Sequence, residues 1–430
     1  MSPLYLAIGV LVLGAVVVLL LVGQLSARRW ALAMLGLPFA IVAAGFGLQT
    51  PQPIALAVVA LSVVCGLALL LIPLLEPEVP LHVAEAAALL LLGTAGAIAL
   101  ASATDLLQAV VGLETLALSA VTLVAIGAGD RALEAAFKYF VLGAISLAGL
   151  LYGLGLVYLG TGSLGFPSAA QISSSPVTLA GVVLVGLGFA FELALVPLHW
   201  GALDAYTAAA PSLAGYVMSA SKLAAAFALG RLVQAAGLEL QQILVWIGSL
   251  TIIWGTFGAL AQATNLRRML AYSAITHAGF IGLALGSGVN GPTAAAFYAA
   301  VYGSTAMLVF AALAGSNPDL RSMDRWRAIG LALGLFSLGG VPPTPGFWAK
   351  LAVLVVAWQA AGPLPTLIAV AGGVFSVLYY LRPLPDLFAA LRADTGAPRP
   401  VFAPGVVLAA LAVIVLGLFP SVAWFLARGA

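Results

Sequence analysis

Apolar segments long enough to cross a lipid bilayer follow one another along the whole chain, and the connections between them are short. A helix of about 20 apolar residues spans the hydrocarbon core of a membrane. The composition agrees, because 63% of the 430 residues are hydrophobic and only 7% are charged, whereas roughly 25% are charged in soluble domains. A backbone in lipid must satisfy its own hydrogen bonds, which favours helices. We therefore expect an all-α polytopic membrane protein.

The apolar segments predict about fourteen transmembrane helices. Arginines test this number, because basic residues collect in short cytoplasmic loops. With the N-terminus outside, the connections after the odd-numbered helices contain eleven of the thirteen arginines, which places both termini on the non-cytoplasmic side. The first segment lacks a basic leader and a cleavage site, so we expect a retained span. The expected ranges are 3–23, 30–48, 54–75, 82–101, 105–127, 134–160, 177–199, 212–230, 241–262, 269–287, 293–315, 329–359, 365–381 and 402–427.

Prolines interrupt two of the predicted helices. Pro197 lies in "FELALVPLHW" of the seventh, and "GGVPPTPG" (339–346) lies well inside the twelfth. Such breaks occur in the discontinuous helices of transporters, where protein or water satisfies the freed backbone groups. They lie five helices apart, which predicts two copies of a five-helix unit with the second copy inverted. For Pro197, a simple kink is the alternative. The expected division is 1–81 (three helices), 82–235 (first repeat), 236–388 (second repeat) and 389–430 (last helix).

All three lysines lie inside or at the shoulder of a predicted span: Lys138, Lys222 and Lys350. Every arginine lies at a helix end or in a loop. A charge at the centre of a transmembrane helix costs about 2.5–3.5 kcal/mol on insertion scales, so a buried lysine indicates a function. Lysine, unlike arginine, can release and regain a proton when burial lowers its pKa. We therefore expect the lysines to transfer protons, although Lys138, about one turn inside its helix, has snorkelling to the interface as an alternative.

Two acids and a histidine share this placement within predicted spans. Glu114 lies in "VVGLETLALS", Glu192 in "FAFELALVP" and His277 in "AYSAITHAGF". A carboxyl group beside a lysine stays ionised and an unpaired buried one takes up a proton, so such pairs can switch state. The hydroxyls of Tyr272, Ser273 and Thr276 extend the last motif toward a possible water chain. The alternatives are static helix–helix ties for the two acids and a packing role for His277.

Metal and redox centres are not expected in this chain. The single cysteine, Cys65, excludes an internal disulfide and cysteine-ligated iron–sulfur or structural zinc sites. The three histidines lie far apart in sequence, which argues against haem or copper. A net charge of +2 without a basic cluster gives no nucleic-acid footprint. If electron transfer drives this protein, another subunit carries the electrons.

Three segments resemble the antiporter-like subunit N of respiratory complex I, the proton-pumping NADH:quinone oxidoreductase. They are "KYFVLGAISLAGLLYGLGLVYLGTGSL", "NLRRMLAYSAITHAGF" and "GGVPPTPGFWAKLAVL", and the likeness runs from about residue 82 to 388. The resemblance implies fourteen helices, inverted five-helix repeats, broken helices seven and twelve, and proton transfer along a central polar axis. It assigns Glu114 to the helix-five glutamate of the family. It assigns Lys138, Lys222 and Lys350 to the lysines of helices six, eight and twelve.

The resemblance further implies a non-redox translocase subunit in a bacterial plasma (inner) membrane. NADH, FMN, iron–sulfur clusters and quinone are then expected on partner subunits, and no cofactor or metal in this chain. Other antiporter-like subunits and small membrane subunits are the implied partners, together with the lipid bilayer and protons. The alternatives are a subunit of a multi-subunit Na⁺/H⁺ antiporter or membrane hydrogenase, and a scaffold that has lost its channel.

The chain departs from this family at three points. Glu192 stands where the family usually has a lysine, so the expected pair with Glu114 becomes a pair of acids, which we expect to share one proton. The segment "GALDAYTAAAPS" replaces the usual proline–aspartate–aromatic segment after helix seven, and Arg267 stands where a lysine is common.

Overall fold

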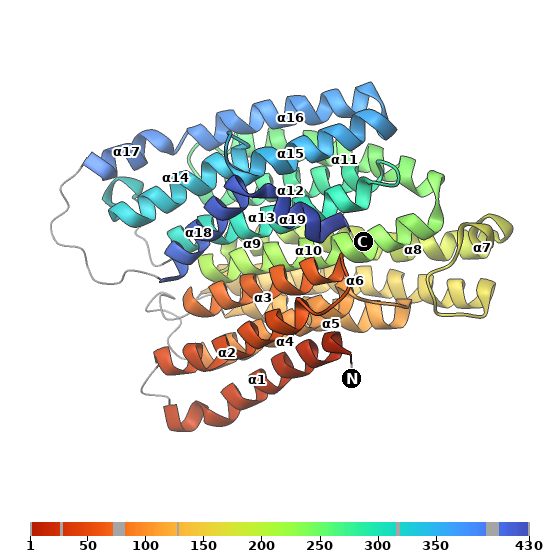
Figure 1. Cartoon of the computed structure of the whole chain (residues 1–430), viewed down its shortest axis with the longest axis horizontal. Coiled ribbons are helices and arrows are strands. Elements are labelled where there is room, and N and C mark those ends of the chain that lie inside the picture. Colours follow the sequence, from red (N-terminus) through yellow and green to blue (C-terminus); the bar gives the residue numbers. More distant parts are fainter. Residues whose placement is uncertain are drawn as a thin grey trace.

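The structure, a computed structural model, describes residues 2–25, 29–71, 82–126, 129–314, 319–392 and 404–428. Within these ranges the regular elements are helices, and extended pairing is limited to an isolated bridge between Asp105 and Gly165. Long helices lie side by side in one bundle (Figure 1). This confirms the all-α expectation.

Ten helices of the described chain are long and apolar enough to cross a membrane, and shorter apolar helices accompany them. The finer number of about fourteen crossings therefore stays a prediction. The first half contains α1 (Pro3–Leu25), α2 (Arg29–Gly47), α3 (Ile54–Leu71), α4 (Val83–Ala101), α5 (Leu106–Ala125), α6 (Asp130–Thr161), α7 (Ala169–Ser174), α8 (Pro176–Leu193), α9 (Trp200–Ala208) and α10 (Pro211–Ala236). The second half contains α11 (Leu238–Ala261), α12 (Leu266–Leu285), α13 (Gly291–Leu313), η2 (Leu320–Ser322), α14 (Arg325–Gly339), α15 (Pro345–Val356), η3 (Ala357–Ala361), α16 (Pro363–Leu381), α17 (Leu384–Arg392), α18 (Pro404–Leu418) and α19 (Pro420–Arg428).

Polar residues outside the apolar runs begin several helices. The carboxylate of Asp105 accepts from the Gln108 amide at the start of α5, and that of Asp324 accepts from the Arg327 amide at the start of α14. Asn265 does the same for α12. Such caps satisfy amide groups that have no partner within the helix. They explain why these short polar connections give well-defined helix starts.

The two helices at the centre of the bundle, α10 and α13, are buried along their length by the surrounding helices (Figure 1). Small residues allow the neighbouring pairs to approach closely. A Cβ atom added at Gly96 of α4 would lie 2.7 Å from the Leu116 nitrogen of α5, and one added at Gly279 of α12 would lie 2.6 Å from the Ile252 nitrogen of α11. Without a hydrophobic force between helices in lipid, such close packing provides much of the association.

Both predicted breaks are present, and each follows the same backbone pattern. The residue that follows α8, Ala194, has φ 62°, and the residue that follows α14, Gly340, has φ 80°. In the first break the Leu195 amide donates to the Ala190 carbonyl at 2.9 Å, and in the second the Val341 amide donates to Phe336 at 3.0 Å. These are the bonds of a left-handed helix cap, which satisfies carbonyls left open by the break.

The second halves of the broken helices differ from the sequence prediction in their bounds. After the first break the chain forms α9 (200–208), so "GALDAYTAAAPS" is largely helical and the predicted end at 199 was wrong. The predicted range 329–359 divides into α14 and α15 around the Pro342–Pro345 cluster, as expected. The reason for the error is that α9 has only nine residues and follows a non-helical stretch that contains proline, so it is too short to be recognised as an apolar span.

Two connections contain helices that the sequence prediction omitted, α7 and α17. The first has a capping box made by Ser168 and Gln171. The second buries Leu384, Leu387 and Ala390 along one face. The last predicted helix, 402–427, is two helices that meet at Phe419, and its first two residues lie outside the described residues, as do 72–75 of the third.

Candidate functional site

Lys222 lies in the middle of α10 and is completely buried. Its ammonium donates a hydrogen bond of 3.2 Å to the Tyr206 hydroxyl on α9, and its Nζ atom is 4.8 Å from the centre of that ring. Lys222 is therefore enclosed by protein on all sides. A hydroxyl together with a ring face stabilises a cation that has lost its water.

Glu192 lies in the last turn of α8, immediately before the first break, and is 2% exposed. Its carboxyl group lies beside the buried Ser221 hydroxyl. The Glu192 carboxyl group lies within electrostatic range of both Lys222 and Glu114. Glu114 is half-buried on α5. The structure thus brings together the two acids and a lysine from three helices.

His277 lies on α12 and is 4% exposed. Its Nδ1 atom is 2.7 Å from the Tyr298 hydroxyl of α13, and its Nε2 atom is 3.0 Å from the Tyr380 hydroxyl of α16. A neutral imidazole donates from one nitrogen and accepts at the other, so both of its positions are used. The two tyrosines make His277 part of a hydrogen-bonded group shared by three helices.

Lys350 lies in the second turn of α15 and contacts the second break directly. Its ammonium donates to the Gly339 carbonyl at 2.8 Å and to the Ser376 hydroxyl of α16 at 2.9 Å. The Gly339 carbonyl is available because α14 stops there. Gly340 allows the lysine to lie so close, since a Cβ atom at that position would be 2.9 Å from the Lys350 Cδ atom. The break therefore forms part of the binding site for the ammonium.

Tyr302 of α13 lies near both Lys222 and His277. The Lys222 Nζ atom is 5.9 Å from the centre of the Tyr302 ring, and the His277 ring centre is 4.8 Å from it. We call the sequence of side chains from Glu114 to Lys350 the polar row. In order, its members are Glu114, Glu192, Lys222, Tyr206, Tyr302, His277, Tyr298, Tyr380, Ser376 and Lys350.

Lys138 lies outside the polar row. Its side chain is 48% exposed, and its ammonium contacts the Glu134 carboxylate at 2.6 Å and the Asp204 carboxylate at 3.5 Å. The Asp204 carboxylate also contacts the Arg268 guanidinium at 2.6 Å. We call these four residues the lateral ion-pair cluster. The structure thus places one of the three lysines on a protein surface, two turns inside α6, with carboxylates as partners.

Sequence reasoning missed most of the hydroxyl groups in the polar row. Tyr206, Tyr298, Tyr302 and Tyr380 are all buried. The spacing of Tyr298 and Tyr302, four residues apart in an apolar helix, is a signal for one polar face. Of the hydroxyls predicted around His277, Ser273 donates to the Leu270 carbonyl of its own helix and Tyr272 packs near Arg268.

Apart from the Ser376 hydroxyl, which donates and accepts hydrogen bonds, the row consists of groups that take up and release protons: carboxyl, ammonium, imidazole and phenol. Among the described residues, no cluster of three or more His, Cys, Asp or Glu side chains has the geometry of a metal site. The arrangement can therefore bind protons and pass them between neighbouring groups.

Comparisons with known families place the chain among membrane subunits of large complexes. Residues 103–376 match the family described as NADH:quinone oxidoreductase/Mrp antiporter, transmembrane, and this range contains all six predicted site residues. NADH-quinone oxidoreductase subunit N from Hydrogenovibrio crunogenus is 36% identical in an alignment 358 residues long, which covers 77% of this chain and 74% of that protein. The subunit N from Deinococcus radiodurans is 35% identical over 370 residues, 80% of this chain and 74% of the relative.

Solved structures extend the likeness to nearly the whole chain. A chain of the membrane-bound sulfane sulfur reductase, an archaeal respiratory membrane complex, is 25% identical with a TM-score of 0.86 and covers 99% of this chain and 96% of its own. A chain of respiratory complex I from Thermus thermophilus is 29% identical with a TM-score of 0.80 over 99% and 100%. A chain of the Mrp complex from Dietzia, 18% identical with a TM-score of 0.83 over 99% and 96%, shares the fold.

Proposed function

The chain belongs to the NADH:quinone oxidoreductase/Mrp antiporter family of transmembrane subunits, and we propose that it translocates protons as subunit N of a complex I-type NADH:quinone oxidoreductase. The observation that carries the proposal is the complete burial of Lys222 beside a buried carboxyl group and a hydroxyl. Such a cation is costly to maintain in a membrane without a use.

The polar row supplies a physical sequence of steps. A proton on Lys222 is stabilised when Glu192 is ionised, so the charge on one group sets the charge that the other favours. Tyr206 keeps the ammonium within reach, and the groups around His277 lie between the two buried lysines. At the far end Lys350 accepts a proton into a site that already contains a carbonyl and a hydroxyl. Protons then move by successive changes of charge on neighbouring groups.

Redox chemistry belongs to partner subunits in this proposal. NADH, FMN, iron–sulfur clusters and quinone are carried there, and this chain acts as the non-redox part of the translocase. Other antiporter-like and small membrane subunits are its neighbours in a bacterial plasma membrane. The similarity to chains of multi-subunit membrane complexes supports such an assembly.

The proposal includes about fourteen crossings with two inverted repeats, 82–235 and 236–388. Three features support the repeats. Each unit contains a break with the same cap and a proline three residues after the left-handed residue. In each unit the first two helices cross at a glycine, Gly96 in one and Gly279 in the other. The first helix of each unit also packs against the last, α4 against α10 and α11 against α16.

Both termini lie on the non-cytoplasmic side in this proposal. The distribution of arginines supports that orientation. Figure 1 agrees in one respect, because α1 starts and α19 ends toward the same end of the bundle.

The test replaces each buried lysine by an apolar residue of similar length, in Lys222→Met and Lys350→Met. Membrane vesicles that contain the intact assembly are given NADH, and protons translocated per NADH oxidised are measured together with assembly on native gels. We expect assembled complexes with strongly reduced translocation. Val183→Met, at an exposed apolar position of α8, is the control for a methionine in the membrane. Full translocation in both lysine variants contradicts the proposal, and NADH-independent exchange of protons for Na⁺ identifies an antiporter subunit instead.

A further inference from the structure

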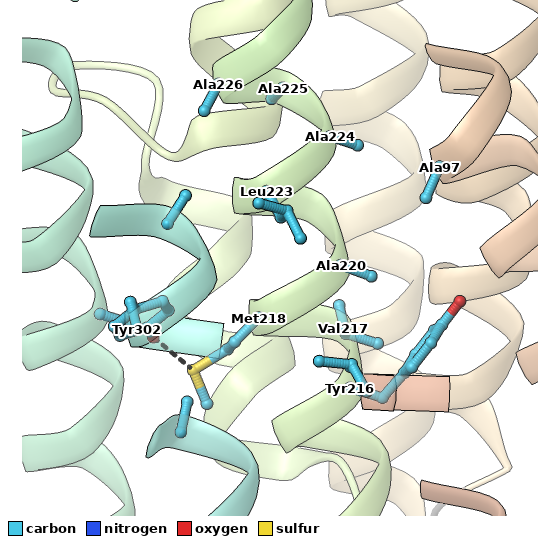
Figure 2. Close-up of a cluster of buried hydrophobic side chains, with 14 of the residues drawn as sticks. Ala97, Tyr216, Val217, Met218, Ala220, Leu223, Ala224, Ala225, Ala226 and Tyr302 are labelled. Atoms are coloured by element: carbon cyan, nitrogen blue, oxygen red, sulfur yellow. Dashed lines mark hydrogen bonds between the residues drawn. The ribbon is translucent and has the colours of Figure 1, made fainter. Parts of the chain in front are cut away.

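Met218, which is not a member of the polar row, forms a hydrogen bond with Tyr302, which is. The Tyr302 hydroxyl donates to the Met218 sulfur at 3.6 Å, and both side chains are buried (Figure 2). No other hydrogen bond of this hydroxyl is present among the described residues. A thioether is a weak acceptor. The Tyr302 hydroxyl therefore makes only a weak hydrogen bond in this structure.

Tyr302 is also close to two members of the polar row, Lys222 and His277. Its ring lies near both groups: the Lys222 Nζ atom is 5.9 Å from the ring centre, and the His277 and Tyr302 ring centres are 4.8 Å apart. Lys222 is bonded to Tyr206, and both nitrogens of His277 are bonded to Tyr298 and Tyr380. Among the described residues, the hydrogen bonds of Lys222 and of His277 therefore go to separate groups of tyrosines, and none of them connects the two residues.

Met218 and Lys222 lie on the same face of α10. The two residues are four positions apart on α10, which places them on one face of the helix, one turn from each other. A hydroxyl that leaves the sulfur thus has the lysine as a neighbour one turn along. The hydrogen of a tyrosine hydroxyl turns readily, and the Tyr302 oxygen can accept from the Lys222 ammonium, which has only donors, once that hydrogen points away from the sulfur.

We propose that Tyr302 is the proton relay between Lys222 and His277, and that Met218 is a positioning residue which holds the Tyr302 hydroxyl out of the relay. The inference rests on the proposed function. In the transfer, an N–H bond of the Lys222 ammonium breaks and an O–H bond forms on Tyr302. The original Tyr302 proton passes to the hydroxyl oxygen of the tyrosine that donates to His277, and that tyrosine's own proton moves to the accepting imidazole nitrogen. One positive charge thereby moves from Lys222 to His277, and Tyr302 ends neutral.

Three variants distinguish the role of Tyr302 as a proton relay from the role of Met218 in positioning the Tyr302 hydroxyl. Tyr302→Phe keeps the ring and removes the hydroxyl, so proton translocation should fall several-fold. Met218→Leu removes the weak acceptor at similar volume, so the passive proton leak under an imposed membrane potential should rise several-fold. Met218→Gln offers a strong amide acceptor, so both leak and translocation should fall. Met307→Leu, at a buried methionine of the same α10 and α13 interface, is the matched control and should behave as the parent.

Infrared spectra of the full chain with isotope-labelled tyrosine provide a readout that needs no turnover. The C–O band of one tyrosine should shift in Met218→Leu and in Met218→Gln, in opposite directions, and neither shift should occur when Phe replaces Tyr302. If the parent translocates protons but the two Met218 variants change leak in the same direction, or no tyrosine band moves, the inference is wrong and Met218 only packs. If the parent itself translocates no protons, the proposed function fails while the spectra still decide the hydrogen bond.

Discussion

The Lys222 ammonium and the Tyr206 hydroxyl lie 3.2 Å apart, and this bond joins the middle of α10 to the short helix that follows the first break. The bond depends on a segment that adopts helix only after the chain has been interrupted. The break accommodates Pro197 and also allows α9 to place the Tyr206 hydroxyl beside the buried Lys222 ammonium.

Removal of that hydroxyl should impair Lys222 without removing it. In Tyr206→Phe the ammonium loses its hydrogen-bond partner in a buried site, and a partnerless buried donor costs about 1–3 kcal/mol. We expect lower thermal stability and slower proton translocation, with partial activity left by the cation–π contact of the ring. Tyr158→Phe, at an exposed tyrosine of α6, should change neither. Equal translocation in both variants would show that the Lys222–Tyr206 bond has no functional weight.

The second break gives a prediction about stability. Gly340 has φ 80°, and an added Cβ atom would lie 2.9 Å from the Lys350 Cδ atom. A left-handed conformation costs a non-glycine residue roughly 1–2 kcal/mol, so Gly340→Ala should lower the unfolding temperature of the full chain in detergent and displace the lysine. Ala194→Gly, at the equivalent position with φ 62°, should have no such cost. Gly149→Ala, in an open position within α6, is the control.

Sequence reasoning went furthest where hydrophobicity and proline decide the structure. The apolar runs located most helices within a few residues, and the prolines located both breaks, because a helix in lipid has few alternatives. The burial of Lys222 followed from its place in the middle of a span. The partners did not follow, since Tyr206 lies in a helix that reads as a loop, and Tyr298 and Tyr380 meet His277 only through tertiary packing.

Lys138 illustrates the opposite limit. Its sequence position suggested either a buried proton carrier or a snorkelling side chain, and the structure shows an exposed ammonium beside two carboxylates. The second of these carboxylates belongs to Asp204, 66 residues away. Only the tertiary fold brings the four residues of the lateral ion-pair cluster together, so their spacing in sequence contains no signal.

The lateral ion-pair cluster allows a test of whether Lys138 takes part in proton transfer. Asp204 bridges Lys138 and Arg268, so Asp204→Asn should alter the setting of Lys138 without touching the polar row. We expect Lys138→Gln and Asp204→Asn to lower translocation by similar factors, and the double variant to be no worse than either alone, because coupled residues are not additive. Independent, multiplying losses in the double variant would show that the two residues do not act as a unit. Wild-type translocation in all three would leave only surface ion pairing, which contributes little.

The last prediction concerns the two acids of the first repeat. Glu192 is buried beside the Ser221 hydroxyl, and it interacts electrostatically with Glu114 and Lys222. Two neighbouring carboxyl groups cannot both ionise cheaply, so we expect them to share one proton and titrate together, with Lys222 stabilising the remaining charge. Infrared spectra of the full chain should then show a protonated carboxyl band near neutral pH. Glu192→Gln should remove or shift that band, and Glu85→Gln, at an exposed acid in the first turn of α4, should leave it unchanged.

Glu192→Lys restores the residue type usual at this position in the family and should give a folded protein whose translocation is altered but not lost, because an ammonium beside Glu114 again forms a switchable pair. An unchanged spectrum in Glu192→Gln would instead make Glu192 a fixed counter-ion of Lys222, and translocation would then fall together with assembly when the charge is removed.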